Sequence, residues 1–262
     1  MRSGTVLCPA AQRKGTVTHM AKERLDKIIA SMGRYSRREV KQLVKDGQIL
    51  VDGKTARSAE EKYDPETAEI LVAGQTLGYR RYTYVMLHKP AGVLSATEDG
   101  RGETVLDLLP AEYRKMGLFP VGRLDKDTEG LLLLTNDGEL AHDLLSPKKH
   151  VDKVYYARVS GTLTQEDCDA FAAGMTLDDG LVCREAGLEI LRAGEESEAL
   201  VTLHEGKFHQ IKRMLAFCGK PVLYLKRLQM GPLILDKTLA KGEFRLLSGE
   251  EIAQIVHGQN IQ

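Results

Sequence analysis

Apolar and polar residues alternate with helical spacing directly after residue 20. Four apolar residues that are three or four positions apart form one face of a first predicted helix: Leu25, Ile28, Ile29 and Met32. Ser36 and Glu39 have the spacing of a capping box, which predicts that a second helix begins there, and Gly47 is a suitable residue to end it. The inner face of this second helix would consist of Val40, Leu43 and Val44. Two short amphipathic helices are therefore expected in this part of the chain.

Strand patterns follow these helices. Residues 49–54 predict a strand, a two-residue Asp-Gly turn and a returning strand. Residues 84–92 predict a strand that ends in a turn containing Pro90, and residues 153–159 alternate well enough for a further strand. Between these two strands a helix is predicted over residues 139–145. The chain is therefore expected to contain both helices and strands.

A different pattern marks residues 122–138. Leu131 to Leu134 are four successive leucines with neither a period of two nor one of 3.6, which indicates a strand covered on both faces, and Asn136-Asp137-Gly138 predicts a turn at its end. The polar loop ahead of this strand contains Asp125. On spacing alone such an Asp is more commonly a turn residue or a solvated charge. However, a loop anchored by the core holds a carboxylate in a fixed orientation, so Asp125 is the candidate reactive group.

Composition narrows the class of protein. The chain has 262 residues, of which 42% are hydrophobic and 28% charged, as in a globular protein with a core. No apolar run approaches the length of a membrane span, and residues 5–11 are too short and too interrupted for a signal-peptide core, so the cytoplasm is the expected location. The four cysteines form no C-x-x-C pair, which argues against a zinc site or a disulfide framework. Residues 1–19 have no periodic pattern, and we expect them to be a disordered extension ahead of a natural start at Met20.

Charge is distributed unevenly although the formal net charge is zero. Residues 20–45 contain eight Lys or Arg and three acids, a balance of +5, whereas residues 46–78 contain three and seven, a balance of −4. Residues 203–228 contain six Lys or Arg and one acid. Scattered solvated charges are an equally common explanation of such counts. A basic helix pair at one end of the chain nevertheless predicts a surface for a phosphate backbone.

The segment R-L-D-K-x-I-A, followed by S-R-R-E-x-x-x-L-V-K-x-G-x-I-L-V-D-G-K, resembles the S4 RNA-binding domain over about 55 residues. S4 domains bind structured RNA. The resemblance implies that Ser36 and seven basic residues lie on or near the RNA-contacting surface. The basic residues are Arg24, Lys27, Arg34, Arg37, Arg38, Lys41 and Lys45.

The run G-R-L-D-x-D-T-x-G-L-L-L-L-T-N-D-G resembles the signature of the pseudouridine synthases, in the branch of ribosomal small subunit pseudouridine synthase A. A second segment, E-G-K-F-H-Q-I-K-R-M at residues 205–214, is similar to another motif of the same family. The resemblance implies that Asp125 is the essential catalytic residue and that Lys212 pairs with it. A lysine within about 4 Å favours the charged form of a carboxylate that acts as nucleophile or base.

The resemblance assigns further residues to the site. The K-x-Y of residues 153–155 matches a family motif whose Tyr packs against the target base, which indicates Tyr155; Tyr156, on the opposite face of the strand, is its internal control. Arg123 would fill the space that the flipped base leaves. His209, Gln210 and Arg213 are expected to contact RNA. Asp127 is interpreted as a loop residue that holds the turn by hydrogen bonds.

The two resemblances imply an α+β protein with an S4 domain at residues 20–78, a linker at 79–83 and a synthase domain at 84–258. They also imply that the synthase domain has a curved, mostly antiparallel sheet and a central cleft. The expected activity is isomerisation of one uridine to pseudouridine in 16S small-subunit ribosomal RNA, without cofactor or metal. We expect a monomer that acts on ribosomal RNA in a partly assembled small subunit, away from membranes. Two alternatives stay open: a synthase acting on 23S large-subunit RNA, and a non-catalytic RNA-binding ribosome-assembly factor.

Overall fold

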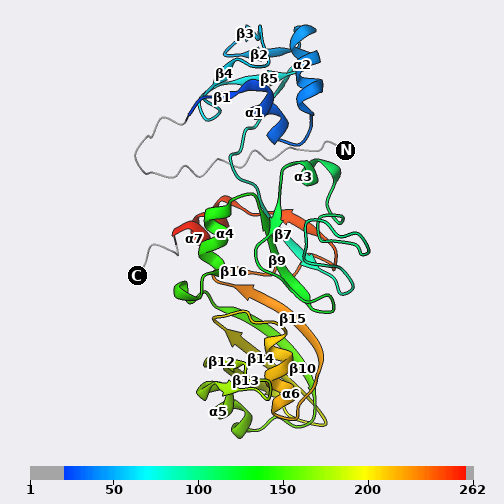
Figure 1. The fold of residues 1–262 in the computed structure, drawn as a ribbon, viewed down its shortest axis with the longest axis vertical. Coiled ribbons are helices and arrows are strands. Elements are labelled where there is room, and N and C mark those ends of the chain that lie inside the picture. The colour runs from blue at the N-terminus through cyan, green and yellow to red at the C-terminus, as the bar shows by residue number, and fades with distance from the viewer. Residues whose placement is uncertain (1–20, 258–262) are drawn as a thin grey trace. The chain divides into compact units, whose positions relative to one another are not determined.

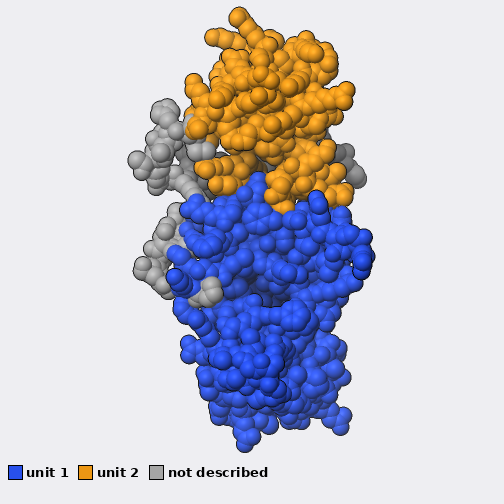
Figure 2. All heavy atoms as spheres, viewed as in Figure 1, with its two compact units in different colours: residues 1–11, 84–108, 119–262 blue, residues 12–83, 109–118 orange. Residues whose placement is uncertain are grey.

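The computed structural model describes residues 21–257 and places them in two compact units (Figure 2). Residues 21–83 together with 109–118 form the smaller unit, and residues 84–108 together with 119–257 form the larger one. The expected extension at residues 1–19, and Met20, lie outside the described residues. No helix within residues 21–257 is long and apolar enough to cross a membrane.

The smaller unit packs two helices on a four-stranded antiparallel sheet of order β3-β2-β5-β6 (Figure 1). Its elements are β1 (Glu23–Arg24), α1 (Leu25–Ser31), α2 (Arg37–Lys45), β2 (Ile49–Val51), β3 (Lys54–Thr55), β4 (Lys62–Tyr63), β5 (Ile70–Val72) and β6 (Gln75–Thr76), with β1 paired to β4. The capping box predicted at Ser36 is present, because the Glu39 amide donates to Ser36 Oγ and the Ser36 amide donates to the Glu39 carboxylate. The predicted hairpin turn is present as well, with Asp52 and Gly53 at φ values of 50° and 75°.

The core of the smaller unit contains the residues that the helical periodicity selected. Leu25, Ile28, Ile29 and Val40 are fully buried, whereas Met32 lies just beyond α1 and is half-buried. A later part of the chain also belongs to this unit, namely residues 109–118 with the short helix α3 (Ala111–Lys115).

The place where this later segment meets the N-terminal helices requires a glycine. Gly33 has φ +75°, and a Cβ atom there would lie 2.1 Å from the carbonyl oxygen of Glu112. Only a residue without a side chain allows this approach and this conformation together.

The larger unit is built on a nine-stranded sheet whose main order is β13-β14-β10-β15-β9-β7-β17 (Figure 1). Its strands are β7 (Tyr84–Lys89), β8 (Phe119–Pro120), β9 (Glu129–Thr135), β10 (Lys153–Ser160), β13 (Gly187–Arg192), β14 (Glu196–Leu203), β15 (Val222–Met230), β16 (Leu233–Ile234) and β17 (Phe244–Leu246). All neighbouring strands are antiparallel except β9 and β15. A separate two-stranded pair joins β11 (Met175–Thr176) and β12 (Val182–Cys183). The predicted antiparallel-rich α+β fold is confirmed.

Strand β9, like its neighbour β7, is buried along its whole length. All seven of its residues are buried, as the run of four leucines predicted. The Asn-Asp-Gly sequence behind it is the start of a helix as well as a turn, because Asp137 caps α4 (Gly138–Leu145) by accepting from the Leu140 amide. The short 3₁₀ turn η1 (Pro147–Lys149) then leads to β10.

Two helices lie over the part of the sheet made by β13, β14, β10 and β15. The helices α5 (Gln165–Ala173) and α6 (Gln210–Phe217) contribute Phe171, Ile211 and Met214 to a core shared with the inward residues of β10 and β14. Leu124, in the loop ahead of β9, belongs to the same core. The loop that carries Asp125 and the helix that carries Lys212 are therefore packed on one hydrophobic cluster.

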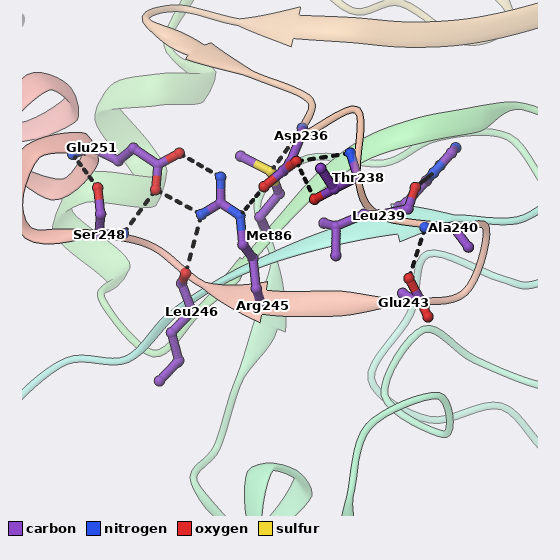
Figure 3. Close-up of polar contacts among 11 residues, drawn as sticks. Met86, Asp236, Thr238, Leu239, Ala240, Glu243, Arg245, Leu246, Ser248 and Glu251 are labelled. Atoms are coloured by element: carbon purple, nitrogen blue, oxygen red, sulfur yellow. Dashed lines mark hydrogen bonds and ion pairs between the residues drawn. The ribbon is translucent and has the colours of Figure 1, made fainter. Parts of the chain in front are cut away.

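The C-terminal part of the larger unit is held by Arg245 on β17 (Figure 3). Its Nε donates to Asp236 Oδ2 at 2.6 Å, and its Nη1 and Nη2 donate to the two carboxylate oxygens of Glu251 at 2.8 and 2.7 Å. Glu251 lies in the last helix, α7 (Gly249–His257), and Asp236 follows β16. One guanidinium thus joins an edge strand, a loop and a helix, a geometry that suits the planar fork of arginine.

Candidate active site

The loop of residues 121–128 is held in place by its contacts with the hydrophobic core. Leu124 is 5% exposed, its amide donates to Ser95 Oγ at 3.1 Å, and Ser95 Oγ donates back to the Leu124 carbonyl at 2.8 Å. The Thr128 amide donates to the Asp125 carbonyl at 3.1 Å, which closes a turn around Asp125. The Asp125 side chain keeps 24% of its surface exposed. An anchored backbone with an accessible carboxylate is the arrangement that the sequence predicted for this loop.

A buried lysine also holds this loop. Lys89, at the end of β7, is fully buried, and its ammonium shares its three hydrogens among four carbonyl oxygens: Pro90 (3.0 Å), Asp125 (3.1 Å), Lys126 (3.2 Å) and Thr128 (2.9 Å). Burial lowers the pKa of Lys89 to about 8. Three of the four acceptors belong to the loop of Asp125, so Lys89 positions the backbone of the predicted reactive residue. Sequence reasoning missed this role because lysine is rarely buried, although its place at the end of an apolar strand was visible.

Lys212, in the first turn of α6, joins two carboxylates of the loop. Its Nζ lies 2.9 Å from Asp125 Oδ2 and 2.5 Å from Asp127 Oδ1. Burial by itself acts to lower the pKa of Lys212, but the hydrogen bonds to Asp127 and Asp125 outweigh it and the pKa is raised. The hydrogen bond from Lys212 lowers the pKa of Asp127. The structure therefore brings Asp125 and Lys212 into contact, and it gives Asp127 an ion pair in addition to its place in the turn.

His209 lies on the other side of Asp125. Its Nε2 is 3.5 Å from Asp125 Oδ1, and its backbone is left-handed, with φ 52°, at the residue that precedes α6. The turn is held by Gln210, whose Nε2 donates to the buried carboxylate of Glu205 at 2.7 Å and whose Oε1 accepts from the Lys207 amide at 3.0 Å. Gln210 is 3% exposed, so its amide shapes the loop; its predicted contact with RNA stays a prediction.

Tyr155 lies inside the protein rather than at its surface. It is 8% exposed and belongs to the same hydrophobic cluster as Leu124, the neighbour of Asp125. Tyr156 points to the opposite face, where it makes an edge contact with Tyr224, with the two ring centroids 6.1 Å apart. The two tyrosines therefore separate as the alternation of β10 predicted. The contact of Tyr155 with a target base stays a prediction.

Two predicted RNA-contacting arginines of the larger unit have different surroundings. Arg123 is exposed, next to the turn that holds Asp125. Arg213 is 29% exposed and is paired with the carboxylate of Asp179. Arg123 therefore has the freedom that a residue entering an RNA helix needs, whereas Arg213 would have to share its charge.

The basic residues of the smaller unit also differ in how many of them pair with acidic side chains. Four of them form the polar side of α2, opposite the buried Val40 and Val44, and all are exposed: Arg37, Arg38, Lys41 and Lys45. Lys41 lies 3.7 Å from Glu60, which also pairs with Arg24 at 3.0 Å, and Lys27 pairs with Glu23 at 2.9 Å. Arg34 donates to Gln75 at 3.2 Å. Helix α2 is thus the basic surface with the least local neutralisation.

Comparison with known proteins gives a matching family model for each of the two units. Residues 23–68 match the family model of the S4 domain, and residues 83–217, half of the chain, match that of RNA pseudouridylate synthase. A crystal structure described as a pseudouridylate synthase superposes with a TM-score of 0.63 at 31% identity, covering 89% of this chain and 99% of that one. The chain therefore belongs to the RNA pseudouridine synthase family, and it is an isomerase.

Its relatives narrow the branch. An uncharacterised RNA pseudouridine synthase of Bacillus subtilis is 48% identical over 87% of this chain and 96% of its own length. Ribosomal small subunit pseudouridine synthase A is 40% identical in Pseudomonas aeruginosa and 38% identical in Vibrio cholerae, over 88% of this chain in both cases and over 100% and 99% of those proteins. The sequence is thus of the small subunit pseudouridine synthase A type.

Proposed function

We propose that the protein converts one specific uridine of small-subunit (16S) ribosomal RNA to pseudouridine. The observation that carries the proposal is the contact between Asp125 and Lys212 at 2.9 Å, because it places an ion-paired carboxylate on a core-anchored loop. The relatives named for the small ribosomal subunit support the choice of RNA. We further propose that it acts in the cytoplasm as a monomer, on a partly assembled subunit.

The reaction exchanges one bond of the nucleoside for another. The bond between N1 of uracil and C1′ of the ribose breaks, the base turns, and C5 bonds to C1′; the proton from C5 is lost and N1 gains one. Asp125 either adds to C1′ as N1 leaves and is displaced when C5 bonds there, or removes the proton from C2′ and returns it after C5 has bonded to C1′; both routes need a single carboxylate held in place. Lys212 orients that carboxylate, and Lys89 fixes the backbone that bears it.

The target base must leave its stack before Asp125 reaches the sugar. Unstacking costs a few kcal/mol, which contacts to the flanking RNA and to the displaced base offset. In this proposal Tyr155 supports the extruded uracil, Arg123 fills the vacated space, and the basic face of α2 binds the RNA backbone. A large-subunit substrate and a non-catalytic assembly role are the alternatives that the test below separates.

Purified protein would be incubated with unmodified small-subunit and large-subunit ribosomal RNA, each partly assembled with its proteins, and pseudouridine would be mapped chemically. Asp125→Asn is the test variant. Asp127→Asn is the matched control, because Asp127 is the second carboxylate that pairs with Lys212. The Asp127 side chain is 75% exposed. We expect one new small-subunit pseudouridine with the wild type and with Asp127→Asn, and none with Asp125→Asn.

Three other outcomes would change the proposed substrate, the proposed activity or the catalytic residue. A product only in large-subunit RNA would replace the proposed substrate. Bound RNA without product in either substrate would favour the assembly-factor role. Product retained by Asp125→Asn would contradict the assignment of the catalytic residue.

A further inference from the structure

An aromatic side chain at the active site has no role in the proposed reaction so far. Phe208 is 75% exposed, the most exposed of the large hydrophobic residues in the part of the chain that the structure describes. A single exposed hydrophobic residue is common and means little by itself. The position of Phe208 is what gives its exposure significance.

Phe208 is stacked on a residue that touches the catalytic carboxylate. Its ring centroid lies 3.8 Å from that of His209, with the ring planes 18° apart, and His209 Nε2 is 3.5 Å from Asp125 Oδ1. One face of the phenyl ring is therefore covered by imidazole, while the other is open to solvent. The two rings form a short stack that leads outward from Asp125.

The backbone presents this stack rigidly. The residues on both sides of it are tied down, because Gln210 bonds to the Lys207 amide and to Glu205, and Glu205 also accepts from the Arg184 amide at 3.0 Å. His209 holds a left-handed conformation, which for a residue other than glycine persists only where the surroundings enforce it. A fixed aromatic platform loses little conformational entropy when a ligand binds to it.

The surroundings favour a nucleobase as the ligand. Lys207, Lys212 and Arg213 follow along the same segment, but each is paired with a carboxylate. Arg123 and Lys126, in the loop of Asp125, are exposed and supply positive charge for the phosphate backbone beside the open aromatic face. Aromatic rings beside basic residues are the usual means by which proteins bind single-stranded RNA without reading its sequence.

We propose that Phe208 stacks on a nucleobase next to the target uridine and thereby holds the RNA strand open at the active site. This inference rests on the proposed function, and it adds a binding residue to it. The base on Phe208 lies two ring layers farther from Asp125 than His209 does, so it belongs to a flanking nucleotide. Its contact is made both before and during the reaction, and it therefore contributes to KM rather than to kcat.

The first test measures binding of small-subunit ribosomal RNA transcript to full-length variants. Phe208→Ala should weaken binding by about 5- to 150-fold, the range for loss of one stacked base. Phe208→Tyr should restore binding, whereas Phe208→Leu, which keeps apolar bulk without a flat ring, should not. Phe217→Ala is the matched control, because Phe217 is a 48% exposed phenylalanine at the opposite end of α6. Since Phe208 lies mostly outside the core, these variants should keep the thermal stability of the wild type.

The second test reports on stacking directly. The chain contains no tryptophan, so Phe208→Trp introduces a single tryptophan, whose emission can be excited apart from that of the nine tyrosines, and Phe217→Trp introduces one at the control position. The transcript should quench the fluorescence of the Phe208→Trp variant and leave that of the Phe217→Trp variant nearly unchanged. Equal quenching at both positions, or binding by Phe208→Ala within twofold of the wild type, would overturn the inference.

Pseudouridine is counted in the same mixtures, so the two proposals fail separately. If Phe208→Ala binds RNA and forms product with the KM of the wild type, the stacking role is wrong while the activity stands. If the wild type forms no product but RNA still quenches the Phe208→Trp variant selectively, the activity is wrong while the stacking role stands.

Discussion

Replacing Lys89 by Met removes the ammonium that supports the loop of Asp125 while keeping the side chain about as long. Of its four acceptors, two have further donors: the Lys126 carbonyl also accepts from the Gly92 amide, and the Asp125 carbonyl accepts from Thr128. The carbonyls of Pro90 and Thr128 lose the lysine that donates to them. We expect this loss to change the free energy of unfolding little and the reaction rate strongly.

The expected change in stability is small because two large effects oppose each other. An unpaired buried carbonyl costs about 1–3 kcal/mol, so two cost about 2–6 kcal/mol. The substitution also removes a buried cation whose pKa is lowered from 10.5 to about 8, and at about 1.4 kcal/mol per pKa unit this relief is about 3 kcal/mol at pH 7. The free energy of unfolding should therefore change by between about −3 and +1 kcal/mol.

The expected change in activity is large. A misplacement of about 1 Å at a reacting group lowers the rate by about 100-fold, and Lys89 fixes three carbonyls of the loop that carries Asp125. Single-turnover rates on ribosomal RNA, measured beside thermal unfolding, separate the two effects. Lys153→Met is the matched control, because Lys153 is also buried, has a pKa lowered to about 8, and donates to the Val151 carbonyl outside the loop. A Lys89→Met enzyme that keeps its turnover rate within threefold would refute the positioning role.

The pH dependence of stability gives an independent check on Lys89. Because burial lowers its folded pKa to about 8, the unfolded chain binds more protons at this residue between about pH 8 and 10.5. The penalty for the buried charge is therefore complete below pH 8 and is relieved as the pH rises to 10.5. Denaturant unfolding should show the wild type gaining stability relative to Lys89→Met over that range. A difference between the two proteins that is constant from pH 7 to 10 would contradict the assigned pKa.

Two further substitutions test the frame around the site. Arg245→Ala should destabilise the protein by about 2–3 kcal/mol, because it removes charge-assisted hydrogen bonds to two carboxylates, and the thermal midpoint should fall by about 4–12 °C while Arg158→Ala, an exposed arginine, changes it little. Gly130→Ala should prevent stable folding, because φ is +109° and a Cβ atom would lie 2.2 Å from the Arg227 carbonyl oxygen; Gly138→Ala, with nothing within 4 Å, should fold normally. Soluble, cooperatively unfolding Gly130→Ala protein would show that the close contact between β9 and β15 is adjustable.

Local sequence patterns were sufficient to predict most elements of the fold. Helical periodicity and a capping box located α1 and α2, and an uninterrupted apolar run identified β9 as a fully buried strand. These signals work because each depends on residues within one turn or one strand. The reactive loop was located by the same reasoning, since a polar turn next to a buried strand is fixed by the core.

Contacts between distant segments were not predictable in this way. Residues 109–118 pack with the N-terminal helices through a backbone approach at Gly33, and no periodicity within either segment encodes that contact. The burial of Lys89 was missed for a related reason, because the carbonyls that compensate its charge come mostly from a loop 36 or more residues farther along the chain. Asp127 was interpreted through its own turn, whereas its ion-pair partner is 85 residues away.

These distant contacts explain why one carboxylate of the loop is suited to chemistry and its neighbour is not. Asp125 is held through its backbone by Lys89 and Thr128 and through its side chain by Lys212, and only 24% of that side chain is exposed. Asp127 shares Lys212 but is 75% exposed, so water competes for its charge. Orientation, rather than the identity of the side chain, therefore distinguishes the two residues. Because the constraints on Asp125 come from β7, from its own turn and from α6, removing the contact made by Lys89 or by Lys212 should lower the rate of isomerisation without touching the carboxylate itself.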